Sequence, residues 1–226
     1  MTAAASPPSP DTTDMKAVHQ IFRKAFGTAQ QTIGIVAHDD TARVEKVGGY
    51  YQEIMDLLHL HPEGEDLLVW PKLLERSPET TELVSRIAAQ HEGVYDGAGR
   101  AESALAAWRT DPNDGSRAAL VEALTALDAL LTAHLDEEEE QILPICAAHF
   151  TMEDWGQLPA HAMTNYRGDR IWLVLGLVYQ NMTPPQRDAL LANLPPPALE
   201  MWNNFGRQAS AEFIADMGHA LSLIKI

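Results

Sequence analysis

Two eleven-residue stretches decide the expected fold, His61-Pro-Glu-Gly-Glu-Asp-Leu-Leu-Val-Trp-Pro71 and His134-Leu-Asp-Glu-Glu-Glu-Glu-Gln-Ile-Leu-Pro144. In each stretch a Glu follows the first His by four residues, and a Pro follows that Glu by six residues. A single His precedes each stretch, His19 by 42 residues and His91 by 43 residues. Because residues four apart on an α-helix lie on one face, each His-x3-Glu pair can direct both side chains toward one point. The chain therefore repeats one pattern of potential metal ligands twice.

The spacing of apolar residues is helical along most of the chain, and the alternation expected for strands is nearly absent. We predict one helix that begins near Asp14 and a second over residues 41–75 that is kinked at Pro62. A third helix is expected after an N-cap at Ser77, and a fourth over residues 116–143. Four such helices with short connections predict an all-α protein with an up-down-up-down four-helix bundle.

The composition divides the chain into three parts. Residues 1–13 are rich in Ala, Ser, Thr and Pro and are predicted to be a disordered tail. Residues 14–147 are predicted to form the bundle. Residues 148–226 contain helix-start signals at Thr151 and Thr183, and we expect them to form a C-terminal extension of short helices packed on the bundle.

The overall composition excludes several classes of protein. The chain has 226 residues, 46% of them hydrophobic, so it can bury a core. Its net charge of −16 argues against binding to nucleic acid or to an anionic membrane surface. Cys146 is the single cysteine, which excludes an internal disulfide and suits a reducing, cytoplasmic location. We expect no signal peptide, and no run of about 18 apolar residues that could span a bilayer.

Imidazole and carboxylate side chains together are typical ligands of a two-metal site inside a helical bundle. The set contains no thiolate, which argues against structural zinc of the cysteine-rich type. Ferritin-like diiron proteins use Glu-x-x-His, which is the reverse order and a shorter spacing. The candidate metal ligands are His19, His61, Glu65, His91, His134 and Glu138.

The two stretches, with Val-His-Gln-Ile-Phe-Arg at residues 18–23 and the pair His91-Glu92, resemble the hemerythrin-like, or HHE cation-binding, domain. The resemblance covers residues 14–147. It implies a four-helix bundle that holds two iron ions as a non-haem diiron centre with an oxo or hydroxo bridge. It also implies the assignment of the ligands: His19 and His61 to one iron, His91 and His134 to the other, and Glu65 and Glu138 as bridges.

The sequence departs from the oxygen-carrying members of this family at one point. Those members have a fifth His four residues before the one that matches His91, and this chain has Ile87 there. The equivalent position before His19 is Met15. Each iron would then keep an open position, which favours peroxide or oxygen chemistry, or sensing, over simple reversible O2 carriage. Tyr95, expected to face the core, or Glu92 could add a ligand, although a buried Tyr more often makes a supporting hydrogen bond.

The remaining histidines and acids have more ordinary interpretations. The acids around Glu138 in the run 136–140 are predicted to be solvated or to hydrogen-bond to ligands. His59 should point away from His61, because two residues along a helix turn the side chain to the opposite face. The histidines without a paired pattern are His38, His59, His149, His161 and His219.

Three functions fit this sequence. The first is a diiron protein that binds or reacts with O2, peroxide or nitric oxide, as a sensor or a detoxifying protein. The second is a diiron oxidoreductase that acts on an organic substrate, with the C-terminal extension closing a pocket lined from both segments. The third is a non-catalytic metal-binding helical bundle. A small diatomic or peroxide ligand is the expected partner, without nucleic acid or membrane, and the sequence leaves enzymatic activity and oligomeric state open.

Overall fold

The structure is a computed structural model that describes residues 9–222. The first eight residues of the predicted tail lie outside the described residues. Residues 9–12, the next part of that tail, lie against the protein: Thr12 is buried, and its hydroxyl donates a hydrogen bond to the carbonyl of Leu143 at 3.3 Å. The described part of the chain contains helices and no strand, which confirms the all-α class.

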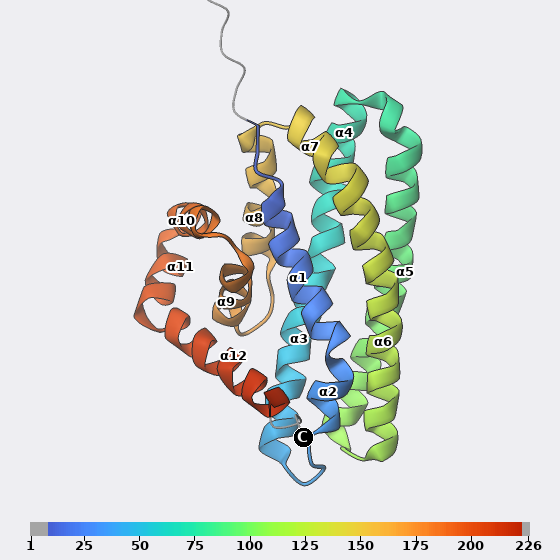
Figure 1. Cartoon of the computed structure of the whole chain (residues 1–226), viewed down its shortest axis with the longest axis vertical. Helices are drawn as coiled ribbons and strands as arrows, with labels where there is room; N and C mark the ends of the chain where they lie inside the picture. The colour runs from blue at the N-terminus through green and yellow to red at the C-terminus, as the bar shows by residue number, and fades with distance from the viewer. Residues whose placement is uncertain (1–8, 223–226) are drawn as a thin grey trace, which may run out of the picture.

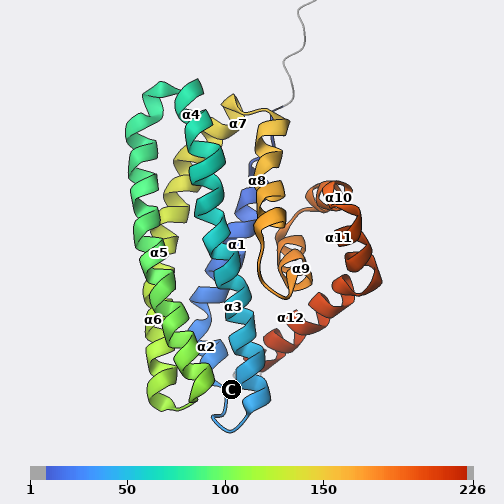
Figure 2. The same cartoon turned by 180° about the vertical axis from the view of Figure 1, so that it is seen from behind.

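Four long helices lie lengthwise beside one another in both views (Figure 1, Figure 2). Helix α5 packs on α6, α6 on α1, α1 on α3, and α3 on α5. The short helix α2 continues from α1 and contacts α6. The bounds are α1 (Thr13–Gly27), α2 (Ala29–Gly34), α3 (Thr41–Gly64), α5 (Thr81–Thr110) and α6 (Asp114–Glu137). A 3-10 turn, η2 (Pro78–Thr80), precedes α5, beside the predicted start at Ser77.

Two π-helical turns interrupt the second and fourth long helices at matching places. The turn η1 (Glu65–Val69) follows α3 and leads into α4 (Trp70–Arg76), and η3 (Glu138–Ile142) follows α6 and leads into α7 (Leu143–His149). Each π turn begins at the Glu of a His-x3-Glu pair. Such turns are rare, and they occur often at functional sites.

The proline six residues after each Glu accounts for the position of these turns. Pro71 and Pro144 occupy the first turns of α4 and α7. Proline has no N–H, and in a regular α-helix its ring would clash with the carbonyl four residues earlier, which the wider π turn avoids. Helix α3 runs through Pro62, where the sequence predicts a kink, and the π turn begins three residues later at Glu65.

The C-terminal helices pack on one side of the long helices (Figure 1). Helix α8 contacts α3, α9 contacts α1 and α3, and α12 contacts α9 and α2. Capping hydrogen bonds mark the starts of α8 at Thr151 and of α10 at Thr183, the two starts that the sequence predicts. The bounds are α8 (Met152–Asn165), α9 (Ile171–Asn181), α10 (Pro184–Asn193), α11 (Pro196–Met201), η4 (Trp202–Gly206) and α12 (Arg207–Ser222).

Along the long helices, one buried apolar cluster lies on each side of the candidate ligands. On α1, Met15 belongs to one cluster and Phe22 to the other, and His19 lies between them. On α5, Ile87 and Val94 are divided between the same two clusters, with His91 between them. The candidate ligands therefore lie at a polar level within an otherwise apolar core.

The helical run Asp114–His149 is long and apolar enough, by length and composition, to cross a membrane. This differs from the expectation that no run reaches that length. Core helices of soluble proteins also reach this length and apolar composition. In this run Leu120, Leu124 and Leu127 are fully buried within the main apolar cluster.

Asp14 joins α1 to α8, because its Oδ1 accepts a hydrogen bond from Trp155 Nε1 at 2.9 Å. Burial raises the pKa of this carboxyl to about 6, although the hydrogen bond from Trp155 acts in the opposite direction. The charge of Asp11 adds to the increase. Between about pH 4 and pH 6 the folded protein therefore holds a proton that the unfolded chain has released, and stability falls as pH rises through this window.

We expect Asp14→Asn to stabilise the protein above pH 6. An Asn can still accept the hydrogen bond from Trp155 and carries no charge to bury. The gain in unfolding free energy should be close to zero at pH 4 and reach about 1–3 kcal/mol at pH 7. Thermal unfolding at both pH values measures it, with Asp96→Asn, at an exposed position on α5, as the control. A variant less stable than the parent at pH 7 would contradict the expectation.

Candidate metal centre

The structure brings the six candidate ligands together in the interior. They come from all four long helices and from the two π turns, and all six side chains are buried. Their ligand atoms form two groups in which all atoms lie within 4.8 Å of one another. The first group is His19, His61, Glu65 and Glu138, and the second is Glu65, His91 and His134. Their role as ligands stays a prediction.

Glu65 belongs to both groups because its two oxygens face different imidazoles. Its Oε1 lies 3.3 Å from Nε2 of His61, and its Oε2 lies 3.3 Å from Nε2 of His91. A carboxylate in this position can bridge two cations, each held by one pair of imidazoles.

Glu138 presents one oxygen to imidazoles from both groups. Its Oε2 lies 3.4 Å from Nε2 of His19, 4.0 Å from Nε2 of His61 and 3.9 Å from Nε2 of His134. The rings within each pair also meet edge to face, with centroids 5.0 Å apart for His19 and His61 and 4.9 Å apart for His91 and His134. The imidazole pairs of the two halves therefore repeat one geometry, whereas Glu138 belongs to the first group alone.

The donor atoms of this site fit a bound cation. Both oxygens of Glu65 and Oε2 of Glu138 are buried and accept no hydrogen bond, and Nε2 of His19, His61 and His91 is likewise unpaired. Burying such atoms without a partner costs free energy, and a metal ion would supply the missing partner. Nitrogen and oxygen donors without sulfur suit iron and other first-row transition metals.

Two acids on the outer side of the site set the orientation of its imidazoles. Nδ1 of His19 donates to Oε1 of Glu139, and Nδ1 of His91 donates to Oδ1 of Asp66, both at 2.9 Å. With the proton on Nδ1, Nε2 carries the lone pair that faces the centre of the site. Each acid directly follows a candidate bridging Glu and orients the single His of the other sequence repeat.

A third imidazole is held by an amide. Nδ1 of His134 donates to Oε1 of Gln90 at 3.1 Å, and Nε2 of Gln90 donates to Glu137 at 2.7 Å. Hydrogen bonds between the acids near Glu138 and the ligands are predicted from the sequence, whereas those of Asp66 and Gln90 are not. One signal for Asp66 is present in the sequence, because an acid directly follows the Glu in both stretches.

The electrostatics of the site differ among its imidazoles and oppose two buried carboxylates without a cation. Burial lowers the pKa of His61 well below its usual value, whereas at His19 the neighbouring carboxylates together outweigh burial and raise the pKa. Burial, reinforced by the Glu138 charge, raises the pKa of Glu65 well above its usual value. Burial acts on Glu138 in the same direction, but the imidazoles of His19 and His61 outweigh it and lower its pKa. Burial lowers the pKa of His134 to about 4. A cation would let both carboxylates ionise together.

The expectation that Tyr95 faces the core is wrong. Its ring is half-buried and stacks on His59, with centroids 6.2 Å apart and the planes 9° from parallel. His59 points away from the site as expected, and its Nε2 lies 2.8 Å from Oε1 of Glu102. Glu92 is exposed. Glu92 does not belong to the two groups of converging His and Glu ligand atoms.

The positions that lack the additional His are apolar and buried. Met15 and Ile87 are both buried in the smaller apolar cluster. Cys146 lies in the same cluster, as a small buried residue of the kind the sequence predicts, and burial raises the pKa of its thiol to about 12. Apolar side chains thus border the site on this side.

The fold and the paired His/Glu geometry define a helical cation-binding protein. The hemerythrin HHE cation-binding domain matches residues 11–146, which is more than half of the chain. The chain belongs to this family, which confirms the resemblance drawn from the two stretches and the single histidines. No curated protein and no solved structure matches the chain.

We expect Glu139→Ala to weaken metal binding about 10–100-fold, because His19 loses the acceptor that holds its tautomer and ring. Glu140→Ala is the matched control, since the neighbouring Glu140 is exposed. Glu139→Gln should restore part of the affinity, because its amide oxygen can accept the same hydrogen bond. Competition with a coloured chelator measures the three affinities. Equal affinity in Glu139→Ala and Glu140→Ala would contradict the role of Glu139.

Proposed function

We propose that this protein holds a non-haem diiron centre that binds or reacts with O2, peroxide or nitric oxide, as a sensor or a detoxifying protein. The observation that carries the proposal is the convergence of six buried His and Glu side chains, five of which have inward atoms without hydrogen-bond partners. The family match supports cation binding by the domain of residues 11–146, which contains all six side chains. We further propose that the four long helices form the up-down-up-down bundle typical of this family.

The candidate residues have separate proposed roles in the centre. His19 and His61 would hold one iron and His91 and His134 the other, with Glu65 and Glu138 shared between them. Iron would supply the redox chemistry, and the chain would orient the ligands through Asp66, Glu139 and Gln90 and limit access of water through the apolar clusters on either side. No further ligand is proposed at Met15 or Ile87, so each iron would keep a position open for a small oxidant.

The proposed partners and location follow from the composition. A net charge of −16 disfavours nucleic acid and anionic membranes, and a single buried Cys146 suits a reducing cytoplasm. The proposed partner is a diatomic molecule or peroxide.

Metal analysis and oxidant titration test the proposal. Protein produced in iron-supplemented medium should contain close to two irons per chain, and His134→Ala should lose most of them. His149→Ala, at an exposed position at the end of α7, should retain them. Anaerobic reduced protein should then change its visible spectrum on addition of O2, peroxide or nitric oxide. Absence of iron, or an iron content unaffected by His134→Ala, would reject the centre.

One observation favours a second candidate function, an oxidoreductase acting on an organic substrate. A cavity beside His61 is lined by residues from both the long helices and the C-terminal helices. Consumption of an added organic compound that depends on iron and an oxidant would distinguish this function. Iron that binds but gives no spectral response to any oxidant would favour the non-catalytic metal-binding bundle instead.

A further inference from the structure

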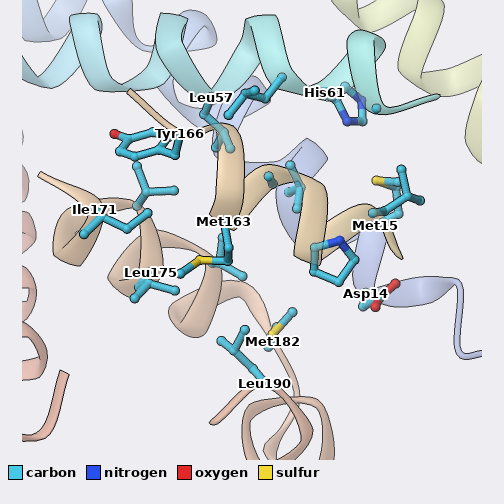
Figure 3. Close-up of a pocket in the computed structure, with 18 of the residues that line it drawn as sticks. Asp14, Met15, Leu57, His61, Met163, Tyr166, Ile171, Leu175, Met182 and Leu190 are labelled. Atoms are coloured by element: carbon cyan, nitrogen blue, oxygen red, sulfur yellow. The ribbon is translucent and has the colours of Figure 1, made fainter. Parts of the chain in front are cut away.

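A cavity of about 160 Å³ lies between the long helices and the C-terminal helices (Figure 3). One wall comes from α1 and α3, including Met15, Leu57 and His61. The opposite wall comes from α8, α9 and α10, including Met163 and Leu175. The second wall lies outside the residues that match the family, so the cavity depends on the part of this chain that the family domain does not contain.

The lining of the cavity is almost entirely apolar. The polar side chains that line it are Asp14, His61 and Tyr166. The hydroxyl of Tyr166 already donates to the buried carboxylate of Glu53, and Oδ1 of Asp14 accepts from Trp155. These two groups are already paired, and the rest of the lining apart from the imidazole of His61 is apolar, which favours an apolar occupant.

The size of the cavity limits the occupant to a compact molecule. An engineered apolar cavity of about 150 Å³ in another protein stays dry and binds benzene or xenon. A cavity of about 160 Å³ with a similar lining has room for one aromatic ring. Three methionines, Met15, Met163 and Met182, line it, and their flexible thioether side chains can adapt to the shape of a ring.

His61 belongs to both the cavity and the candidate metal centre. Its Nε2 lies 3.3 Å from Oε1 of Glu65, while its ring contributes to the lining of the cavity. Figure 3 shows this ring at the edge of the pocket, with Met15 and Asp14 below it on the right of the view. Of the six candidate ligands, His61 alone lines the cavity. A molecule in the cavity would therefore contact the side of the centre that includes His61.

We propose that this cavity binds a neutral, compact apolar molecule the size of one aromatic ring, in contact with His61. The cavity is a binding site distinct from the metal centre, and its occupancy rests on the cavity alone and not on the proposed iron chemistry. The carboxylate of Asp14 adds selectivity, because its charge disfavours an anionic substituent on the ring.

The test uses the full chain with its methionine methyl groups labelled with carbon-13. Benzene and phenol are the probes, and benzoate is the anionic comparison. We expect benzene and phenol to shift the methyl signals of Met15, Met163 and Met182 in a saturable way, and to leave that of the exposed Met152 unchanged. Benzoate should bind at least about tenfold more weakly.

A matched pair of variants tests whether binding occurs in the cavity. Ala162 lines the cavity, and Ala160 on the same helix is exposed and does not line it. Ala162→Phe should abolish the benzene-induced shifts by filling the space, and Ala160→Phe should leave them unchanged. The shifts in the unmodified protein decide the question even if Ala162→Phe fails to fold.

Three outcomes would overturn the proposal. These are no saturable shift with either neutral ring up to its solubility, shifts that spare all three cavity methionines, and shifts that persist in folded Ala162→Phe. Iron content is measured on the same samples. Benzene binding by a protein that contains no iron would reject the proposed metal centre and support the cavity site. Iron binding without benzene binding would support the metal centre and reject the cavity site.

Discussion

Glu65→Gln is expected to remove both metal ions from the protein. Glu65 is the side chain whose two oxygens face imidazoles from both halves of the site, His61 and His91, each at 3.3 Å. The Gln side chain has nearly the same shape as the Glu side chain, but it lacks the negative charge and has one donor oxygen instead of two. Loss of a residue that merely supports a ligand costs about 10–100-fold in metal affinity, so loss of a shared ligand should cost more.

Glu63→Gln is the matched control for this prediction. Glu63 lies two residues earlier on α3 and is exposed, so its removal should leave the metal content unchanged. Elemental analysis of both variants and the parent, purified in the same way, is the measurement. Full metal content in Glu65→Gln would show that the carboxylate is not a ligand. Far-ultraviolet circular dichroism establishes that the variant is folded.

Removal of the metal by a chelator is expected to lower the thermal stability of the protein without unfolding it at room temperature. A cation present at about 1,000 times its dissociation constant stabilises the folded state by about 4 kcal/mol. For a chain of this length that corresponds to a decrease in Tm of roughly 8–16 °C. The metal-free protein keeps its main apolar cluster, to which Phe22 and Leu127 belong, so the helices should persist.

Circular dichroism at room temperature and during heating separates this result from its alternatives. Adding iron back should restore the Tm, and chelator should have no effect on Glu65→Gln. An unchanged Tm in the parent protein would contradict metal binding by the folded state. Complete loss of helix on chelation would favour a structural metal, as in the non-catalytic bundle.

Much of the centre follows from local sequence. The four-residue spacing of His61 to Glu65 and of His134 to Glu138 places each pair on one helix face, whatever the surrounding fold. Repetition of the same pattern, with His19 and His91 at matching distances, predicts that the two pairs meet. The structure does bring these residues together. The capping signals at Thr151 and Thr183 are equally local, and both helices begin where they predict.

Features that depend on the rotation of one helix relative to another could not be predicted in the same way. Each residue turns an α-helix by about 100°, so a small change of register moves a side chain to another face. Tyr95 was expected to face the core and instead stacks on His59. The π turns that begin at Glu65 and Glu138 add such changes of register, because their hydrogen bonds span five residues instead of four.

The sequence by itself determined the all-α class, the family and the six candidate ligands, because helical periodicity and His-x3-Glu spacing are properties of single segments. Only the tertiary structure decided that Asp66 orients His91 and that Glu139 orients His19, across the two repeats. It also decided that the C-terminal helices leave a cavity beside His61. These features join residues far apart in the chain, and their distances depend on how whole helices pack, which no local pattern of residues specifies.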